Sequence, residues 1–480
     1  MSAAADWIRE LPARLGRRTL VALLVIAALG LGLRAIAVVH PVANPADDSH
    51  AYYGLAKALY EEGSFGDPEF KNSSDWSPGA PLLYAAAFFL TGGAREGTAR
   101  IVEALLGTAA IFVVFALARR LAAEPSRRRD GQPADRPRHR LATGLGGLAP
   151  PDLTGLAAAF GAAVYPPFIH STGELMSEPP ATLTLPAAVL AFLWASEEGR
   201  RWWAWLVPGV LFGMTAMFRP EYLLVGGAFV LLAALRAGRR GGWRPGLAGA
   251  ALLAGALVAV IVPWTIRNAD VLGRLVPIST GGGKALYVGT FLPADGEYQR
   301  VKAILYRRQT GRSLPPQSEA LNEVDPTPLF DHVAETAYPD LPRDTALGRI
   351  GKENFSKYFG EDPVGYLAMT ARKVGRMWSS GPGAAMSSTA GRVVQILLVF
   401  AAIAGLVALG LRRRWWELVA MATPPVLVTL VGAATLAAPR RNEVLMTLVF
   451  PLAALALGWA LAALSSGRRW SPPQASSPPN

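Results

Sequence analysis

The chain has 480 residues, of which 51% are hydrophobic and 17% are charged. Several apolar runs approach or exceed the roughly 20 residues that a helix needs to cross a bilayer, so the composition excludes a soluble enzyme and predicts an all-α polytopic membrane protein. The chain has no cysteine, which excludes disulfides, thiolate chemistry and Cys-based metal sites. Its net charge is +12, but the arginines cluster between apolar runs as topology signals do, so nucleic acid is not an expected partner.

Ten apolar runs are predicted to span the membrane. They cover residues 20–39, 99–118, 153–170, 179–196, 202–218, 222–235, 245–266, 393–411, 416–437 and 444–464. The first run is too long for the apolar part of a typical secretory signal, so we expect a retained anchor. The shorter run at 80–90 is more typical of a re-entrant or surface helix.

The positive-inside rule then fixes the orientation. If the run at 80–90 does not cross, every arginine cluster falls on the side of the N-terminus, which predicts ten spans with both termini in the cytoplasm. Residues 127–150 are predicted to be a flexible cytoplasmic loop. The expected divisions are an N-terminal membrane module at 1–266 with a first external loop at 40–98, an external loop domain at 267–392, C-terminal spans at 393–464 and a disordered tail at 465–480.

A helix lying on the outer membrane surface is predicted directly after the first span, at residues 48–62. Tyr52, Leu55 and Leu59 recur at helical spacing, and Gly63 is a natural stop. The adjacent Asp47 and Asp48 stand at its start. Either one caps the helix, or one is a catalytic base held at the bilayer surface.

Further charged residues fall at the outer ends of the predicted spans. Glu174 and Glu178 fit ordinary helix-start chemistry, but two carboxylates meeting in one cavity would act as a base and an orienting group. The expected outer basic residues are Arg219, Arg267, Lys284, Arg440 and Arg441. They suit a phosphate at headgroup depth, whereas contact with anionic lipid or a salt bridge to the acidic loop is the alternative. Arg34, inside the first span, is expected to extend to the membrane surface.

The long outer segment contains two further signals. Ser279-Thr280-Gly281-Gly282-Gly283-Lys284 lacks the spacing of a nucleotide-binding loop. It is therefore either a flexible turn or a backbone contact for a donor phosphate or sugar. Residues 344–378 are predicted to be helical, with a break near Pro363.

These motifs, in this order, resemble the GT-C membrane glycosyltransferases, specifically glycosyltransferase family 39, over nearly the whole chain. Asp48-Ser49-His50-Ala51-Tyr52-Tyr53-Gly54-Leu55-Ala56 resembles the family's Asp-x-x-x-Tyr-x-x-x-Ala stretch in the first external loop. The segment from Ser77 to Tyr84 is similar to its His-Pro-Pro-Leu-Tyr-like segment, but lacks the His and interrupts the prolines. Further similarities are at Glu174 to Pro180, Arg219-Pro220-Glu221, Pro263 to Asn268 and Gly348 to Trp378.

The resemblance implies a GT-C-like bundle that transfers a sugar from a polyprenyl-phosphate donor to an acceptor hydroxyl on a protein, lipid or glycan, with inversion. The implied base is Asp48, with Asp47 as the less favoured choice and Glu178 as a second carboxylate. The five basic residues above would bind the donor phosphate. Other substrate contacts are expected from Tyr52, Glu174, Glu221 and Tyr287.

No cofactor and no metal are implied, although the adjacent Asp47 and Asp48 leave a divalent cation open. We expect a multi-pass protein of a bacterial plasma membrane with its site on the external side. Two alternatives stay open at this point. One is a transporter or scramblase of polyprenyl-linked sugars, and the other is a non-catalytic subunit of cell-envelope assembly. The absence of an inverted repeat and of mid-span charges argues against the transporter.

Overall fold

The computed structural model describes residues 15–42, 47–66, 73–123, 148, 150–197, 200–238 and 243–467. Within these ranges the regular structure is helical, without a strand. The loop predicted at 127–150 and the tail predicted at 465–480 fall almost entirely outside the described residues. The side chain of Asp47 is outside them as well.

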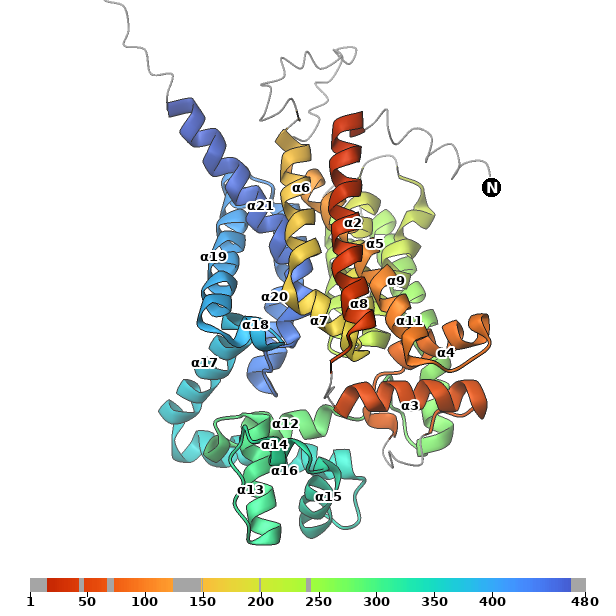
Figure 1. The fold of residues 1–480 in the computed structure, drawn as a ribbon, viewed down its shortest axis with the longest axis vertical. Coiled ribbons are helices and arrows are strands. Elements are labelled where there is room, and N and C mark those ends of the chain that lie inside the picture. Colours follow the sequence, from red (N-terminus) through yellow and green to blue (C-terminus); the bar gives the residue numbers. More distant parts are fainter. Residues whose placement is uncertain are drawn as a thin grey trace, which may run out of the picture.

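A bundle of long helices runs along the vertical axis of Figure 1 and contains most of the apolar sequence. Its helices are α2 (Arg17–Val39), α5 (Glu96–Ala122), α6 (Pro150–Val164), α7 (Pro166–Glu174), α8 (Glu178–Ala195), α9 (Leu206–Phe218) with the short η3 (Trp202–Trp205), α10 (Tyr222–Gly238), α11 (Trp243–Leu272), α19 (Thr389–Leu411), α20 (Trp415–Ala434) and α21 (Arg441–Gly467). Every predicted span therefore overlaps one or two helices of this bundle.

Six of these helices are long and apolar enough to cross a membrane, and the bent pair α6–α7 makes a seventh if it counts as one span. The helices α8, α9 and α10 have only 18, 13 and 17 residues, yet they pack inside the same bundle. The chain is thus an all-α polytopic membrane protein, and the number of ten spans stays a prediction.

The bend between α6 and α7 explains the position of Arg34. The two helices meet at 43°, where Pro166 and Pro167 follow Tyr165, because proline cannot donate the hydrogen bond that would continue the ladder. Arg34 is only 1% exposed, and its guanidinium donates to the carbonyls of Ala162 at 3.3 Å and Ala163 at 3.4 Å in the last turn of α6. The expectation that Arg34 extends to the membrane surface is therefore wrong, since it satisfies carbonyls at a helix end inside the bundle.

Glycines allow the close crossings in this bundle. A Cβ atom at Gly209 of α9 would collide with the backbone of Leu253 in α11, and one at Gly405 of α19 would collide with the backbone of Leu452 in α21. Small residues at such crossings let helix backbones approach closely, which is the usual basis of helix packing in membranes.

Two helices, α3 (Asp47–Glu61) and α4 (Gly79–Thr91), pack against each other at one end of the bundle, which we call the α3 end (Figure 1). The short η1 (Ser73–Asp75) lies between them in sequence. The apolar run at 80–90 belongs to α4, whose 13 residues are too few to span. Figure 1 also shows that α2 begins and α21 ends at the opposite end of the bundle.

The segment between α11 and α19 forms a group of shorter helices at the α3 end, shown in green to cyan in Figure 1. They are α12 (Gly282–Thr290), η4 (Leu292–Ala294), α13 (Tyr298–Thr310), α14 (Glu319–Asn322), α15 (Pro326–Ala337), α16 (Arg343–Glu361), α17 (Pro363–Ser379) and α18 (Ala384–Ser387). They enclose a core of their own around Phe291, Leu305 and Phe330. The predicted break near Pro363 separates α16 from α17, and Asp362 caps α17 through a 2.8 Å bond from the amide of Gly365.

Candidate active site

Asp48 stands in the first turn of α3 and is bonded to residues from two distant parts of the chain. Its Oδ2 lies 2.5 Å from Nη2 of Arg440, which directly precedes α21, and its Oδ1 accepts a 3.3 Å bond from Nε1 of Trp76. Burial alone would raise the pKa of Asp48, but the charges of Arg440 and Lys284 outweigh it and lower that pKa below its usual value. The carboxylate is therefore ionised and fixed in direction.

A second ion pair lies behind the first. Arg219, in the turn between α9 and α10, pairs with Glu178 at the start of α8 and with Glu221, 3.0 Å away. Burial would raise the pKa of Glu221, but Arg219 and Arg441 lower it to about 2. The Arg219-Pro220-Glu221 turn thus directs opposite charges at each other across a tight corner.

Arg440 joins the two pairs. Its Nε lies 3.9 Å from Oε1 of Glu178, so carboxylates and guanidinium groups alternate from Asp48 through Arg440, Glu178 and Arg219 to Glu221. The side chain of Arg440 is 40% exposed, whereas that of Glu178 is 1% and that of Arg219 is 10% exposed. Arg440 is therefore the cation of this cluster that an incoming ligand reaches most easily.

Three more predicted residues lie beside this cluster. Tyr52 follows Asp48 by one turn of α3, and burial together with the charges of Asp48 and Glu178 raises its pKa to about 12. Lys284, near the start of α12, is close enough to lower the pKa of Asp48 by its charge. Arg441 interacts electrostatically with Glu221, and its buried Nη1 has no hydrogen-bond partner among the described residues.

Three other predicted residues lie elsewhere. The Nη2 of Arg267 donates to the carbonyl of Phe65 at 3.0 Å, and its guanidinium lies over the ring of Trp264. Tyr287 is 3% exposed and packs in the core of the short helices. Glu174 pairs with His170 at 3.4 Å in α7. Roles for these three in substrate binding stay predictions that their positions do not support.

The glycine-rich turn at residues 279–284 packs against α16, and the amide of Gly283 is bonded there. The amide of Gly283, at the start of α12, donates a 2.6 Å bond to Oδ1 of Asp344, the second residue of α16. A Cβ at this glycine would collide with the Asp344 backbone. The glycine is therefore needed for close packing of α12 on α16, and a side-chain carboxylate already caps this end of α12.

Hydrogen bonds and an ion pair that were not predicted from the sequence join the first loop to the short helices. Asp75 accepts a 2.6 Å bond from Thr280 and a 2.8 Å bond from Arg343, and the amide of Thr280 donates to the carbonyl of Ser74 at 2.8 Å. Trp76, which follows directly, was missed too. Nothing in the local sequence marks Asp75, because its partners are more than 200 positions away, and the partner of Trp76 is on a different helix, α3.

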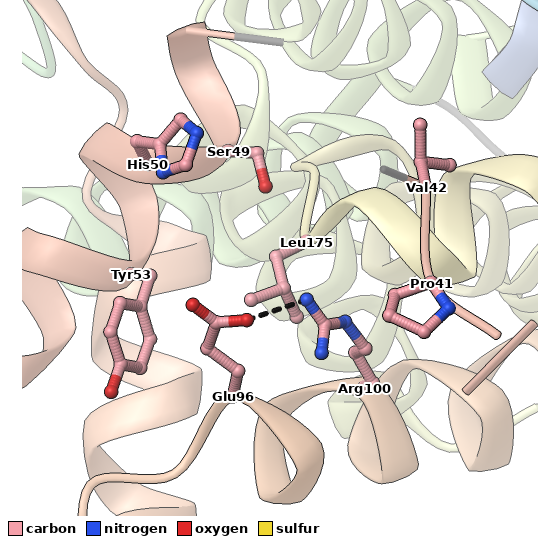
Figure 2. Close-up of a pocket in the computed structure, with 8 residues that line it drawn as sticks. All are labelled: Pro41, Val42, Ser49, His50, Tyr53, Glu96, Arg100 and Leu175. Atoms are coloured by element: carbon pink, nitrogen blue, oxygen red, sulfur yellow. Dashed lines mark hydrogen bonds and ion pairs between the residues drawn. The ribbon is translucent and has the colours of Figure 1, made fainter. Parts of the chain in front are cut away.

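A polar cavity of about 330 Å³ opens on another face of α3. Figure 2 shows Ser49, His50 and Tyr53 of α3 around it, facing Glu96 and Arg100 of α5, which form an ion pair of 2.6 Å. Ser49 follows Asp48 in the chain, but the residues that line this cavity include no member of the cluster. No group of three or more His, Asp or Glu side chains in the described part of the chain is arranged to hold a metal ion.

No protein-family model matches the chain, and no curated protein matches it. Among solved structures, it aligns with archaeal oligosaccharyltransferase AglB from Archaeoglobus fulgidus in complex with an inhibitory peptide and a dolichol-phosphate, with 14% identity over 96% of this chain and 52% of that chain, at a TM-score of 0.52. The apo form of the A. fulgidus oligosaccharyltransferase aligns with 15% identity over 94% of this chain and 51% of that chain, at a TM-score of 0.53.

ArnT from Cupriavidus metallidurans bound to undecaprenyl phosphate aligns with 14% identity over 94% of this chain and 81% of that chain, but a TM-score of 0.39 is too low to support an argument. The likeness to AglB concerns the fold: the chain is a GT-C-like membrane bundle. It spans about half the length of the AglB chains that it matches.

Proposed function

We propose that this chain is a glycosyltransferase that moves a sugar from a polyprenyl-phosphate donor to an acceptor hydroxyl at the external face of the membrane. The observation that carries the proposal is the cluster from Asp48 through Arg440 to Glu178 at the α3 end of the bundle. It combines an ionised carboxylate with an accessible guanidinium at the level where a membrane lipid would present its phosphate. The fold shared with AglB supports this reading, and membership of glycosyltransferase family 39 is the finer part of the proposal.

The chemistry is a single displacement. The acceptor oxygen attacks the anomeric carbon as the bond from that carbon to the phosphate oxygen breaks, and polyprenyl phosphate leaves with both electrons of that bond. Asp48 takes the acceptor proton, and Trp76 and Arg440 hold the carboxylate in place. One displacement inverts the anomeric centre.

The charges of the cluster also suit the leaving group. The cations of the cluster are Arg219, Arg440, Arg441 and Lys284. Charge-assisted bonds from arginine would stabilise the phosphate as it departs. Arg219 is neutralised by two carboxylates, so Arg440, Arg441 and Lys284 are the better candidates to bind the phosphate.

Orientation and location are part of the same proposal. The α3 end faces the outside of a bacterial plasma membrane, the arginine-rich ends lie in the cytoplasm, and the helices α12 to α18 form an external domain. The acceptor is a protein, lipid or glycan whose hydroxyl reaches Asp48.

The test is transfer by the purified full chain in detergent. A panel of polyprenyl-phosphate sugars is offered with candidate acceptors, and mass spectrometry detects the glycosylated product and the released polyprenyl phosphate. Release that depends on acceptor and gives the inverted product supports the proposal. Movement of the donor between leaflets of vesicles without any transfer would replace it with a transporter.

A further inference from the structure

A second cavity, of about 410 Å³, lies on the other flank of the α3 end, between α12, α16, α17 and the last turn of α20. Its lining is mostly apolar and includes Leu286, Phe355, Phe359, Leu367 and Ala434. This volume is within the range of about 300–1,000 Å³ that is typical of small-molecule sites. The cavity plays no part in the proposed transfer reaction.

The surface around this cavity is apolar and exposed. At the junction of α16 and α17, Val364 is 77% exposed, Leu367 60%, Phe355 46% and Phe359 40%. Phe355 and Phe359 stack on each other with ring centroids 5.4 Å apart. A contiguous exposed apolar patch of this kind marks a contact surface rather than a water-facing one.

The apolar surface continues onto the bundle. The helix α17 packs against α19 and α20, and Figure 1 shows it on the flank of the bundle away from α3. Both partners expose apolar side chains along their length, such as Phe400 of α19 at 65% and Leu430 of α20 at 59%. These are candidate membrane spans, so hydrocarbon would cover the flank of the bundle against which α17 packs.

Polar groups at the cavity suit a lipid headgroup. Lys352 of α16 is part of the lining, together with the hydroxyls of Ser356 and Thr370. The neighbouring carboxylate of Glu353 is engaged by Arg349 at 3.7 Å and by the hydroxyl of Tyr338. Among the side chains that line the cavity, Lys352 is the charged one. A lysine beside an apolar slot at the end of a spanning helix is suited to bind a phosphate at headgroup depth.

The position of the cavity argues against the donor as its occupant. Leu286 and Thr290 of α12 line the cavity, whereas Lys284 acts on Asp48. Residues two apart on an α-helix point in roughly opposite directions, because each residue turns the helix by about 100°. The cavity and the Asp48 cluster therefore lie on opposite faces of α12.

We propose that this cavity binds the acyl chain of a membrane phospholipid, with Lys352 at its phosphate, and that the α16–α17 junction is seated in the membrane surface. An amphipathic segment of this kind places its apolar face about 5–10 Å into the boundary between headgroups and chains. The site would fix α12 relative to the bilayer. It depends on the membrane bundle and not on the proposed transfer activity.

The depth of the α16–α17 junction in the bilayer can be measured, and it tests whether this junction is seated in the membrane surface. Since the chain has no cysteine, Leu367→Cys in the full chain can be labelled with a fluorophore and reconstituted in phosphatidylcholine–phosphatidylglycerol vesicles containing lipids with a spin label on the upper acyl chain. We expect quenching as strong as at Val394→Cys on α19, which is 50% exposed, and none at Ser313→Cys in the loop after α13. Val364→Cys replaces Leu367→Cys if that variant does not fold. A label that stays as bright as at Ser313→Cys overturns the proposal.

The presence of a bound lipid tests whether the cavity binds a phospholipid. Native mass spectrometry of the purified chain should show a retained phospholipid that Ala434→Trp, which fills the cavity, removes. Val426→Trp, on the same helix but outside the cavity lining, is the matched control and should keep the lipid. The proposal fails if no phospholipid is retained, if Ala434→Trp retains it, or if added polyprenyl phosphate displaces it, since displacement would assign the cavity to the donor chain. Transfer activity is measured separately, so a failure here leaves the proposed function standing.

Discussion

Asp48 is held from two sides, because Trp76 bonds to one carboxylate oxygen and Arg440 to the other. A base role and a capping role make different predictions for Asp48→Asn. Asn caps a helix about as well as Asp and still accepts from Trp76, but it takes up no proton. We expect turnover to fall by about 10²–10⁴-fold, measured as product formed under saturating donor.

The matched control is Asp47→Asn, which changes the same charge one residue earlier and should cost much less. Near-normal turnover in both folded variants would leave Asp48 with capping alone. An inactive Asp47→Asn beside an active Asp48→Asn would move the base by one residue.

The lowered pKa of Asp48 predicts the acid side of the pH profile. Arg440 and Lys284 outweigh burial and hold this pKa below 3.8, so the free enzyme keeps its base ionised throughout the neutral and weakly acidic range. Because Asp48 stays ionised over this range, we expect kcat/KM to be constant from pH 8 down to about pH 5. Arg440→Gln, which removes the main stabilising charge, should move the acid limb to higher pH. A wild-type limb near pH 6 would indicate another proton acceptor.

Arg440 and Arg267 allow a comparison between an arginine proposed to bind the donor phosphate and one that is held by other residues of the chain. Arg440 is paired with Asp48 and exposed at the cluster, whereas Arg267 is bonded to Phe65 and stacked on Trp264. We expect Arg440→Lys to raise the KM for the donor about tenfold or more, because lysine lacks the forked geometry for phosphate. Arg267→Lys should change that KM much less. Donor titrations of the two variants decide this, and a larger effect at Arg267 would reverse the assignment.

At the scale of elements, one buried lysine fixes α17 in place. The Nζ of Lys373 donates to the carbonyls of Gly289 at 2.7 Å, Ala433 at 2.9 Å and Thr435 at 2.9 Å. It thereby joins α12 to the end of α20, where carbonyls have no partner within the helix. We expect Lys373→Met to destabilise the fold by about 1–3 kcal/mol for each carbonyl left buried and unpaired, seen as a lower thermal unfolding midpoint in detergent.

Lys57→Met is the control for this prediction. Lys57 is 50% exposed and pairs with Glu61 at 3.9 Å, an arrangement that contributes about 0–1 kcal/mol. Equal unfolding midpoints for the two variants would show that Lys373 does not hold α17.

The helices themselves could be predicted because each depends on its own local sequence. Apolar runs gave the elements of the bundle, and Pro363 gave the break between α16 and α17. The position of Arg34 could not be predicted in this way. Its partners, Ala162 and Ala163, become available only because α6 ends at a bend, and that bend matters to Arg34 only once α2 and α6 lie side by side.

At the scale of the whole molecule, the candidate site residues could be picked out from the local sequence, but their contacts with each other could not. Asp48 and Glu178 were predicted from their places at outer helix ends and from the family resemblance, and Arg440 because the positive-inside rule makes arginine uncommon on the outer side. Their pairing depends on the way α3, α8 and α21 meet in space, which no local pattern encodes. Tyr287 was also expected at the substrate, and it packs in the core of the short helices, so a substrate-binding role for it stays a prediction that its position does not support.

The orientation of the bundle in the membrane is a property of the whole chain, and we expect the α3 end to face the outside. The absence of native cysteine allows single-Cys labelling without background. Gly97→Cys at the start of α5, Ser74→Cys in η1 and Ser313→Cys in the loop after α13 all lie at the α3 end, and they should react with an impermeant maleimide added outside intact cells. Gln132→Cys, at a position outside the described residues, should react only after the membrane is opened, because its arginine-rich surroundings favour the cytoplasm. External labelling of Gln132→Cys with protection of the other three would invert the bundle. It would place the Asp48 cluster on the side where polyprenyl-linked sugars would have to be presented from the cytoplasm, and the proposed acceptors would then have to be cytoplasmic as well.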